Sequence, residues 1–182
     1  MKRVFMATMG AILGAGLLAA GPAAAVDEPA GYRMDGYRSP TPAGLSGATT
    51  VDTAAARTLI EGGQAIPINV MKLDRSTLPG GPWIMAKPFH QIPGSVWLPG
   101  VGVGDPGPEM TAWFARHLAR LTGGDTGRGV LFYCLADCWM SWNAAKRALS
   151  LGYTRVYWYP LGSDGWMEAG LPTEEGRPLP FD

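Results

Sequence analysis

Residues 129–148 read GVLFYCLADCWMSWNAAKRA and contain both cysteines of the chain, Cys134 and Cys138. Their first part, residues 130–133, is a short, continuous apolar run, which is typical of a strand buried on both faces of a parallel sheet. From Trp142 onward, small apolar residues recur at helical spacing, so we expect a helix to begin within residues 138–141. The sequence therefore predicts strand, tight loop and helix, with Cys134 at the carboxyl end of the strand.

This position makes Cys134 the candidate nucleophile. In open α/β sheets, functional sites lie at the carboxyl ends of the strands. The loop N–H groups and the N-terminus of the following helix carry partial positive charge, which stabilises a thiolate. The alternative is that Cys134 is an inert thiol in the core, where free cysteines are often buried.

On both sides of residues 129–148, apolar and β-branched runs alternate with helical patterns. Further strands are expected at residues 65–70, 95–98 and 155–159, and helices at residues 54–61, 108–122 and 162–169. Residues 72–87, with Pro-Gly-Gly-Pro at their centre, are expected to form a long loop that covers a site. The alternation predicts a single α/β domain over residues 50–172, with a central parallel sheet and helices on both faces.

The two ends of the chain differ from this pattern. Residues 1–25 have a basic start, an apolar core and an Ala-x-Ala site, so we predict a cleaved signal peptide rather than a membrane anchor. The mature protein would then be periplasmic. Residues 26–49 are rich in proline and glycine and are expected to form an extended arm, and residues 173–182 a proline-rich, irregular tail.

Charge and cysteine content narrow the function. Lysine and arginine number 15, as do aspartate and glutamate, and no basic patch stands out, so we expect no nucleic-acid partner. The two cysteines form the only possible disulfide within the chain, and an oxidising compartment permits it. Because that bridge would close a very short loop, it would stabilise the fold little. If the disulfide forms, a chemical role explains it better than stability does.

Four segments between Val51 and Pro172 resemble those of rhodanese-like domains. They are His90-Gln91-Ile92-Pro93-Gly94-Ser95 before a strand, Phe132-Tyr133-Cys134 at a strand end, Leu151-Gly152-Tyr153-Thr154-Arg155-Val156-Tyr157, and the segment from Gly165-Trp166 to Leu171-Pro172. The Cys138-Trp139 pair, the N-terminal segment and the aromatic run at residues 156–160 are also similar to the exported CXXCW-motif proteins associated with PQQ-dependent alcohol catabolism. Here the spacing is C-x-x-x-C-W.

The resemblance implies sulfur transfer. Cys134 would hold a sulfur atom as a persulfide and pass it to another thiol, and Cys138 would resolve the persulfide. The persulfide would lie in an anion cradle of loop amides, contributed by Leu135, Ala136, Asp137, Trp139 and Met140. The loop itself contains an acid and no arginine or lysine, although Lys146 and Arg147 follow on the helix. Because Asp137 repels a dianion, efficient transfer from thiosulfate is not expected.

Other interpretations remain open at this point. The pair fits a thiol–disulfide redox protein, or, with Met140 or His90, a soft-metal site, although we expect neither a metal nor a cofactor. A third possibility is a non-catalytic accessory module that binds a periplasmic PQQ-dependent dehydrogenase or its cytochrome through an aromatic face. For an enzyme, the substrate would be a small sulfur compound or thiol. A possible pocket is predicted from Trp142, Trp158, Trp166 and His90.

Overall fold

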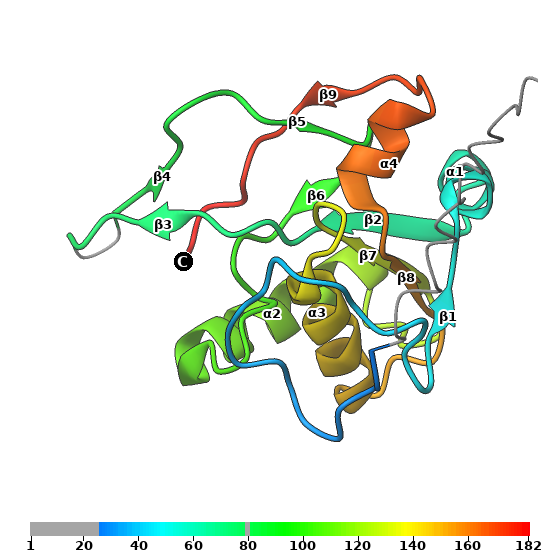
Figure 1. The fold of residues 1–182 in the computed structure, drawn as a ribbon. Helices are drawn as coiled ribbons and strands as arrows, with labels where there is room; N and C mark the ends of the chain where they lie inside the picture. The colour runs from blue at the N-terminus through cyan, green and yellow to red at the C-terminus, as the bar shows by residue number, and fades with distance from the viewer. Residues whose placement is uncertain (1–25, 79–80) are drawn as a thin grey trace, which may run out of the picture.

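The computed structural model describes residues 26–78 and 81–182, so the signal peptide predicted at residues 1–25 lies outside the described residues. Its centre is a parallel sheet of five strands in the order β1-β8-β7-β2-β6 (Figure 1). The strands are β1 (Thr49–Thr50), β2 (Ala65–Asn69), β6 (Val96–Trp97), β7 (Gly129–Tyr133) and β8 (Val156–Tyr159).

The middle of the sheet is β7, all five residues of which are buried. It pairs in parallel with β2 from Ala65↔Gly129 to Asn69↔Tyr133, and with β8 on its other side. A side chain at Gly129 would collide with the backbone carbonyl of Gln64, so glycine is needed where β7 enters the sheet. The apolar run therefore became the buried central strand, and its carboxyl end is covered on both sides by neighbouring strands.

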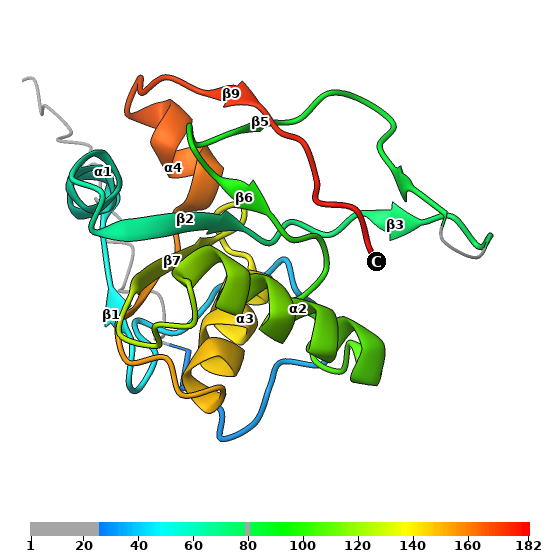
Figure 2. The ribbon, with the colours of Figure 1, turned by 180° about the vertical axis from the view of Figure 1, so that it is seen from behind.

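Helices cover both faces of this sheet. On one face lie α1 (Thr53–Glu61) and α4 (Gly162–Glu168), and on the other lie α2 (Gly107–Thr122) and α3 (Trp139–Ser150), as Figures 1 and 2 show. The larger core lies beneath α2 and α3 and includes Phe114, Phe132 and Trp142. The smaller core lies beneath α1 and α4 and includes Tyr133. The predicted α/β class, with a parallel sheet covered on both faces, is confirmed.

Local signals explain the helix ends. The Asp52 carboxylate caps α1 by accepting a hydrogen bond of 2.8 Å from the backbone N–H of Ala55. Proline occupies the first turn of α2, and Gly123, in the left-handed conformation, ends that helix. Within residues 26–78 and 81–182, no helix is long and apolar enough to span a membrane.

Two small antiparallel pairs were not predicted. One is β3 (Asp74–Arg75) with β4 (Trp83–Ile84), inside the segment expected to be a loop, and the other is β5 (His90–Gln91) with β9 (Glu174–Glu175). The second pair ties the C-terminal tail to the body, so the tail is irregular only in part. Figure 1 shows the tail continuing from β9 toward β3.

The N-terminal arm, residues 26–49, lies along α3 and ends in β1, which joins the edge of the sheet beside β8. Asn143, fully buried on α3, fixes the arm. Its side-chain amide donates to the carbonyl oxygens of Arg33 and Gly102, both at 2.8 Å, and its oxygen accepts from the Arg33 N–H at 2.9 Å. The arm is therefore held in place by hydrogen bonds to a buried side chain.

Candidate functional site

The two cysteines face one another across the loop between β7 and α3. Cys134 directly follows β7, and Cys138 is the N-cap residue of α3. Their Sγ atoms lie 2.7 Å apart, and both residues are buried free thiols. The strand, loop and helix predicted from residues 129–148 therefore bring the two predicted site cysteines into direct contact.

The environment divides the charge unequally between the two sulfurs. The hydrogen bond with Cys134 lowers the pKa of Cys138 to about 7, helped by the backbone N–H groups of Met140 and Leu135 and opposed by burial. The same hydrogen bond, together with burial and the charge of Cys138, raises the pKa of Cys134 well above its usual value. At pH 7 Cys138 is therefore about half ionised, and above this pH the pair holds one negative charge, centred on Cys138, while Cys134 keeps its proton.

The loop is fastened to α4 on its other side. The carbonyl oxygen of Cys134 accepts a hydrogen bond of 2.9 Å from the Ser163 N–H. Gly162 packs so closely against the same carbonyl that a side chain there would collide with it. Asp137, exposed at the turn of the loop, has a φ of 49°, a left-handed conformation that aspartate tolerates better than most residues. These contacts fix the direction in which Cys134 leaves the strand.

Two amides of the predicted anion cradle have other partners. The Ala136 N–H donates to a carboxylate oxygen of Asp164, at 3.0 Å, and the Trp139 N–H donates to the carbonyl oxygen of Tyr37, at 2.9 Å. The amides of Leu135 and Met140 stabilise the sulfur atoms instead. These loop amides therefore stabilise the cysteine thiolate rather than a separate bound anion.

The arm supplies a cation that the sequence analysis missed. Arg38 pairs as an antiparallel bridge with Cys138, and its positive charge lowers the pKa of both cysteines. The Ser39 N–H donates to the Asp137 carbonyl oxygen at 3.0 Å, and the Trp139 indole donates to Ser39 Oγ at 3.1 Å. The loop has no arginine or lysine of its own, but the arm places Arg38 beside it. No local signal links residues so far apart in the sequence.

The two basic residues of α3 point elsewhere. Arg147 is buried, and its guanidinium donates to the carbonyl oxygens of Val101, Val103 and Gly104. Lys146 donates to the carbonyl oxygen of Pro29 at 3.2 Å. Both therefore hold neighbouring segments in place.

The structure does not bring together the three tryptophans and His90, from which a pocket was predicted. Trp142 and Trp158 are fully buried in the core beneath α2 and α3, whereas Trp166 belongs to the core on the opposite face of the sheet. His90 is exposed on β5 and pairs with Glu175. The rings fill the interior because their indole N–H groups find internal acceptors, such as Ser141 Oγ for Trp158 at 3.0 Å.

Sequence reasoning also missed a cavity of about 310 Å³ beside the cysteine loop. Leu135, the residue after Cys134, forms part of its wall. The remaining wall comes from residues that follow β2 or precede β5: Met71, Leu73, Met85, Ala86, Lys87, Pro88 and Phe89.

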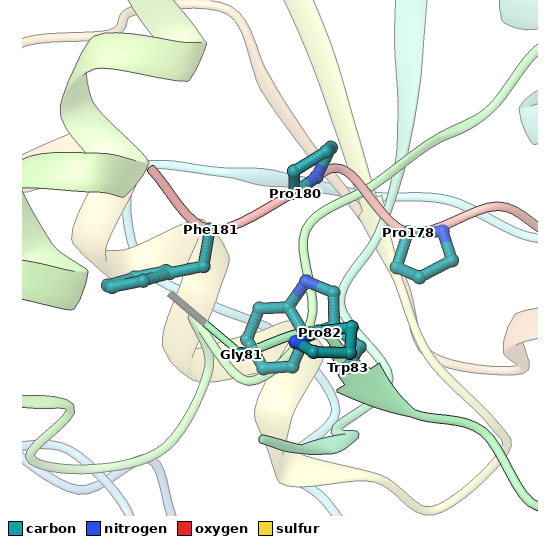
Figure 3. Close-up of a pocket in the computed structure, with 6 residues that line it drawn as sticks. All are labelled: Gly81, Pro82, Trp83, Pro178, Pro180 and Phe181. Carbon is teal, nitrogen blue, oxygen red and sulfur yellow. The ribbon is translucent and has the colours of Figure 1, made fainter. Parts of the chain in front are cut away.

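A second cavity of about 310 Å³ lies between β4 and the C-terminal tail (Figure 3). Trp83 and Phe181 line it, together with Gly81 and three prolines. The Trp83 indole donates to the carbonyl oxygen of Leu179 at 2.7 Å, which closes the tail over this region. No residue of the cysteine loop lines this cavity, so we do not assign the chemistry to it.

No protein-family model and no curated protein sequence matches the chain. Among solved structures, it is similar to a thiosulfate sulfurtransferase from Pseudomonas aeruginosa, with 18% identity and a TM-score of 0.48 over 74% of this chain and 22% of that chain. It is also similar to a rhodanese-like domain from Anabaena sp., with 19% identity and a TM-score of 0.43 over 69% and 77% of the two chains.

The polysulfide-sulfur transferase homodimer from Wolinella succinogenes is similar at 16% identity and a TM-score of 0.45, over 71% of this chain and 80% of that chain. The chain thus spans about a fifth of the length of the Pseudomonas aeruginosa protein and most of the length of the other two.

Proposed function

We propose that the protein transfers sulfur between thiols and carries it as a persulfide on Cys134. The observation that carries this proposal is the pair of sulfurs 2.7 Å apart at the carboxyl end of β7. Their mutual hydrogen bond lowers the pKa of Cys138 to about 7 and raises that of Cys134. A thiol with a raised pKa is a poor nucleophile until its proton is removed. The Cys138 thiolate is placed to remove it, so the pair contains both the nucleophile and its base.

In the loading step, Cys134 Sγ attacks the outer sulfur of a donor persulfide, R–S–SH. The proton of Cys134 passes to the Cys138 thiolate as the new S–S bond forms. The S–S bond of the donor breaks, and the donor leaves as the thiolate RS⁻. The products are the Cys134 persulfide, the Cys138 thiol and RS⁻, so charge and protons balance and no external oxidant is needed.

A second function uses the same geometry. When no acceptor is present, the Cys138 thiolate attacks the inner sulfur of the Cys134 persulfide, which forms a disulfide and releases HS⁻. The short distance between the sulfurs favours this step as well. A thiol–disulfide redox protein is therefore the second candidate, and Cys138 would be required for it.

The two candidates are separated by substitution at each cysteine. We would supply a persulfide donor and a thiol acceptor, and measure both the persulfide formed on the acceptor, which is the product of sulfur transfer, and the HS⁻ released, which is the product of redox exchange. Sulfur transfer predicts that Cys134→Ser abolishes turnover. Cys138→Ser should keep part of the rate at neutral pH and more at high pH, because it removes the base but also the charge that raises the pKa of Cys134, while burial still raises that pKa. Redox exchange predicts that each substitution abolishes turnover at every pH. Full turnover by Cys134→Ser would refute both.

We also propose export to the periplasm and an association with a PQQ-dependent dehydrogenase system. The support is the pattern of residues 1–25 and the resemblance of residues 134–145 to exported CXXCW-motif proteins. Cell fractionation of the full chain and of a variant lacking residues 1–25 tests the first point. Because Trp142 and Trp158 are buried, a partner would contact other residues than the aromatic face first expected.

A further inference from the structure

The cavity beside Leu135 lies at the carboxyl ends of β2 and β7, next to the loop that begins at Cys134. Met71 and Leu73 follow the carboxyl end of β2, and Leu135 follows the carboxyl end of β7, the strand paired with β2. Crevices at the carboxyl ends of adjacent parallel strands are the usual binding places in such sheets. The cavity therefore adjoins the proposed sulfur carrier through one residue of the loop.

Two residues of the cavity wall, Met71 and Phe89, are held in place by the neighbouring core. The carbonyl oxygen of Met71 accepts from the Trp97 indole at 2.8 Å, and its N–H donates to the buried Asn69 side chain at 3.0 Å. Phe89 packs on Trp97 with ring centroids 5.3 Å apart, and its carbonyl oxygen accepts from the Gly176 N–H. A volume of about 310 Å³ is at the lower end of the range for small-molecule sites, so the ligand is small.

The chemistry of the wall selects an apolar ligand. Every lining residue is apolar except Lys87. Two thioethers and a phenyl ring, from Met71, Met85 and Phe89, make soft contacts that suit aromatic rings and sulfur. Asp137 and Asp164, on the loop and beside it, oppose a doubly charged inorganic anion.

We infer that this cavity binds the apolar body of a small organic thiol that accepts sulfur from Cys134. The inference rests on the proposed function and names its acceptor class. The Lys87 ammonium at the rim favours the ionised form of the incoming thiol, which is the form that attacks. The acceptor sulfur attacks the outer sulfur of the persulfide, the Cys134–sulfur bond breaks, and Cys134 leaves as a thiolate that regains a proton from Cys138.

The test starts from full-length protein loaded on Cys134 with cysteine persulfide, an organic donor, and freed of excess donor. Loss of the persulfide is followed by mass spectrometry with benzyl mercaptan or with 2-mercaptoethanesulfonate as acceptor. The cavity predicts that benzyl mercaptan reacts about tenfold faster at equal, low thiolate concentration, because its ring is buried. Equal rates for the two thiols would overturn the inference.

Substitution locates the effect. Met85→Glu places a charge in the cavity wall, and Met167→Glu on α4 is a matched control, since the two methionines are 38% and 46% exposed. We expect Met85→Glu to lower the rate with benzyl mercaptan about tenfold and Met167→Glu to leave it unchanged. The same rate in all three proteins would contradict a ligand in this cavity.

Binding without reaction separates this inference from the proposed function. Benzyl methyl sulfide has the same apolar body and cannot accept sulfur, and its binding is measured by ligand-observed NMR. Binding that Met85→Glu weakens and Met167→Glu does not would support the cavity, even if Cys134 takes up no sulfur and the proposed function fails. Sulfur uptake by Cys134 with no such binding would overturn the cavity and leave sulfur transfer standing.

Discussion

The two ends of the described chain both cross the body of the domain, and they do different work. The N-terminal arm pairs with the cysteine loop and contributes Arg38 to the charge of the thiol pair. The C-terminal tail packs Phe181 against Trp113, with ring centroids 5.3 Å apart, and no residue of the loop lines the cavity that it closes. Of these two irregular segments, one thus contacts the candidate site and the other packs against the core. Substitutions in the two regions should therefore affect different measurements.

The largest effect is expected on the packing side. Trp113 is fully buried, contacts Trp83 and Phe181, and donates to the carbonyl oxygen of Pro180 at 3.2 Å. Trp113→Ala should lower the free energy of unfolding by about 3–5 kcal/mol, because it leaves a large cavity. Urea denaturation measures this. In the folded fraction, the rate of thiol alkylation should equal that of the wild type. A changed rate would show that packing beside the C-terminal tail also affects the thiols.

A smaller loss of stability is expected on the arm side, where it should be accompanied by a change at the thiols. Asn143→Ala leaves the buried polar groups of Arg33 and Gly102 without partners, at a cost of about 1–3 kcal/mol. Because the arm covers the loop, its loosening should speed alkylation of Cys138. Asn69→Ala is the matched control: that asparagine is equally buried but contacts Met71 instead of the arm. Equal alkylation in both variants would show that the arm does not guard the thiols.

The smallest effect is purely electrostatic. Alkylation of the wild-type pair should increase with pH through a midpoint of about 7, because deprotonation of Cys138 produces the reactive thiolate. Arg38→Ala removes a nearby positive charge, so the pKa of Cys138 should rise and the rate at pH 7 should fall roughly two- to threefold. Arg57→Ala on α1 controls for loss of an exposed arginine. A midpoint that is the same in both variants would exclude Arg38 from the site.

Much of the fold could be predicted because its signals are local. The apolar run of β7 and the helical spacing after Trp142 lie within one continuous stretch of sequence. The glycines that end α2 directly follow that helix. The strands β3, β4, β5 and β9 have two residues each, too few for a periodic pattern. Pairing with distant segments, rather than their own sequence, makes them strands.

The site was predictable to a different degree. The position of Cys134 after a buried strand and the presence of Cys138 four residues later were enough to propose the pair. The contribution of Arg38 was not, since it arises from pairing across about a hundred residues. The tryptophans misled because a buried ring and a pocket-lining ring have the same sequence signal, and only their hydrogen bonds distinguish them.

The position of the transferred sulfur shows which cysteine carries it. The reduced protein is treated with cysteine persulfide, thiols are capped, and cleavage before Asp137 places Cys134 and Cys138 in separate peptides. The account predicts a gain of about 32 Da, one sulfur atom, on the peptide that contains Cys134. A gain confined to the peptide that contains Cys138, or only a disulfide between the two peptides with no release of HS⁻, would contradict it.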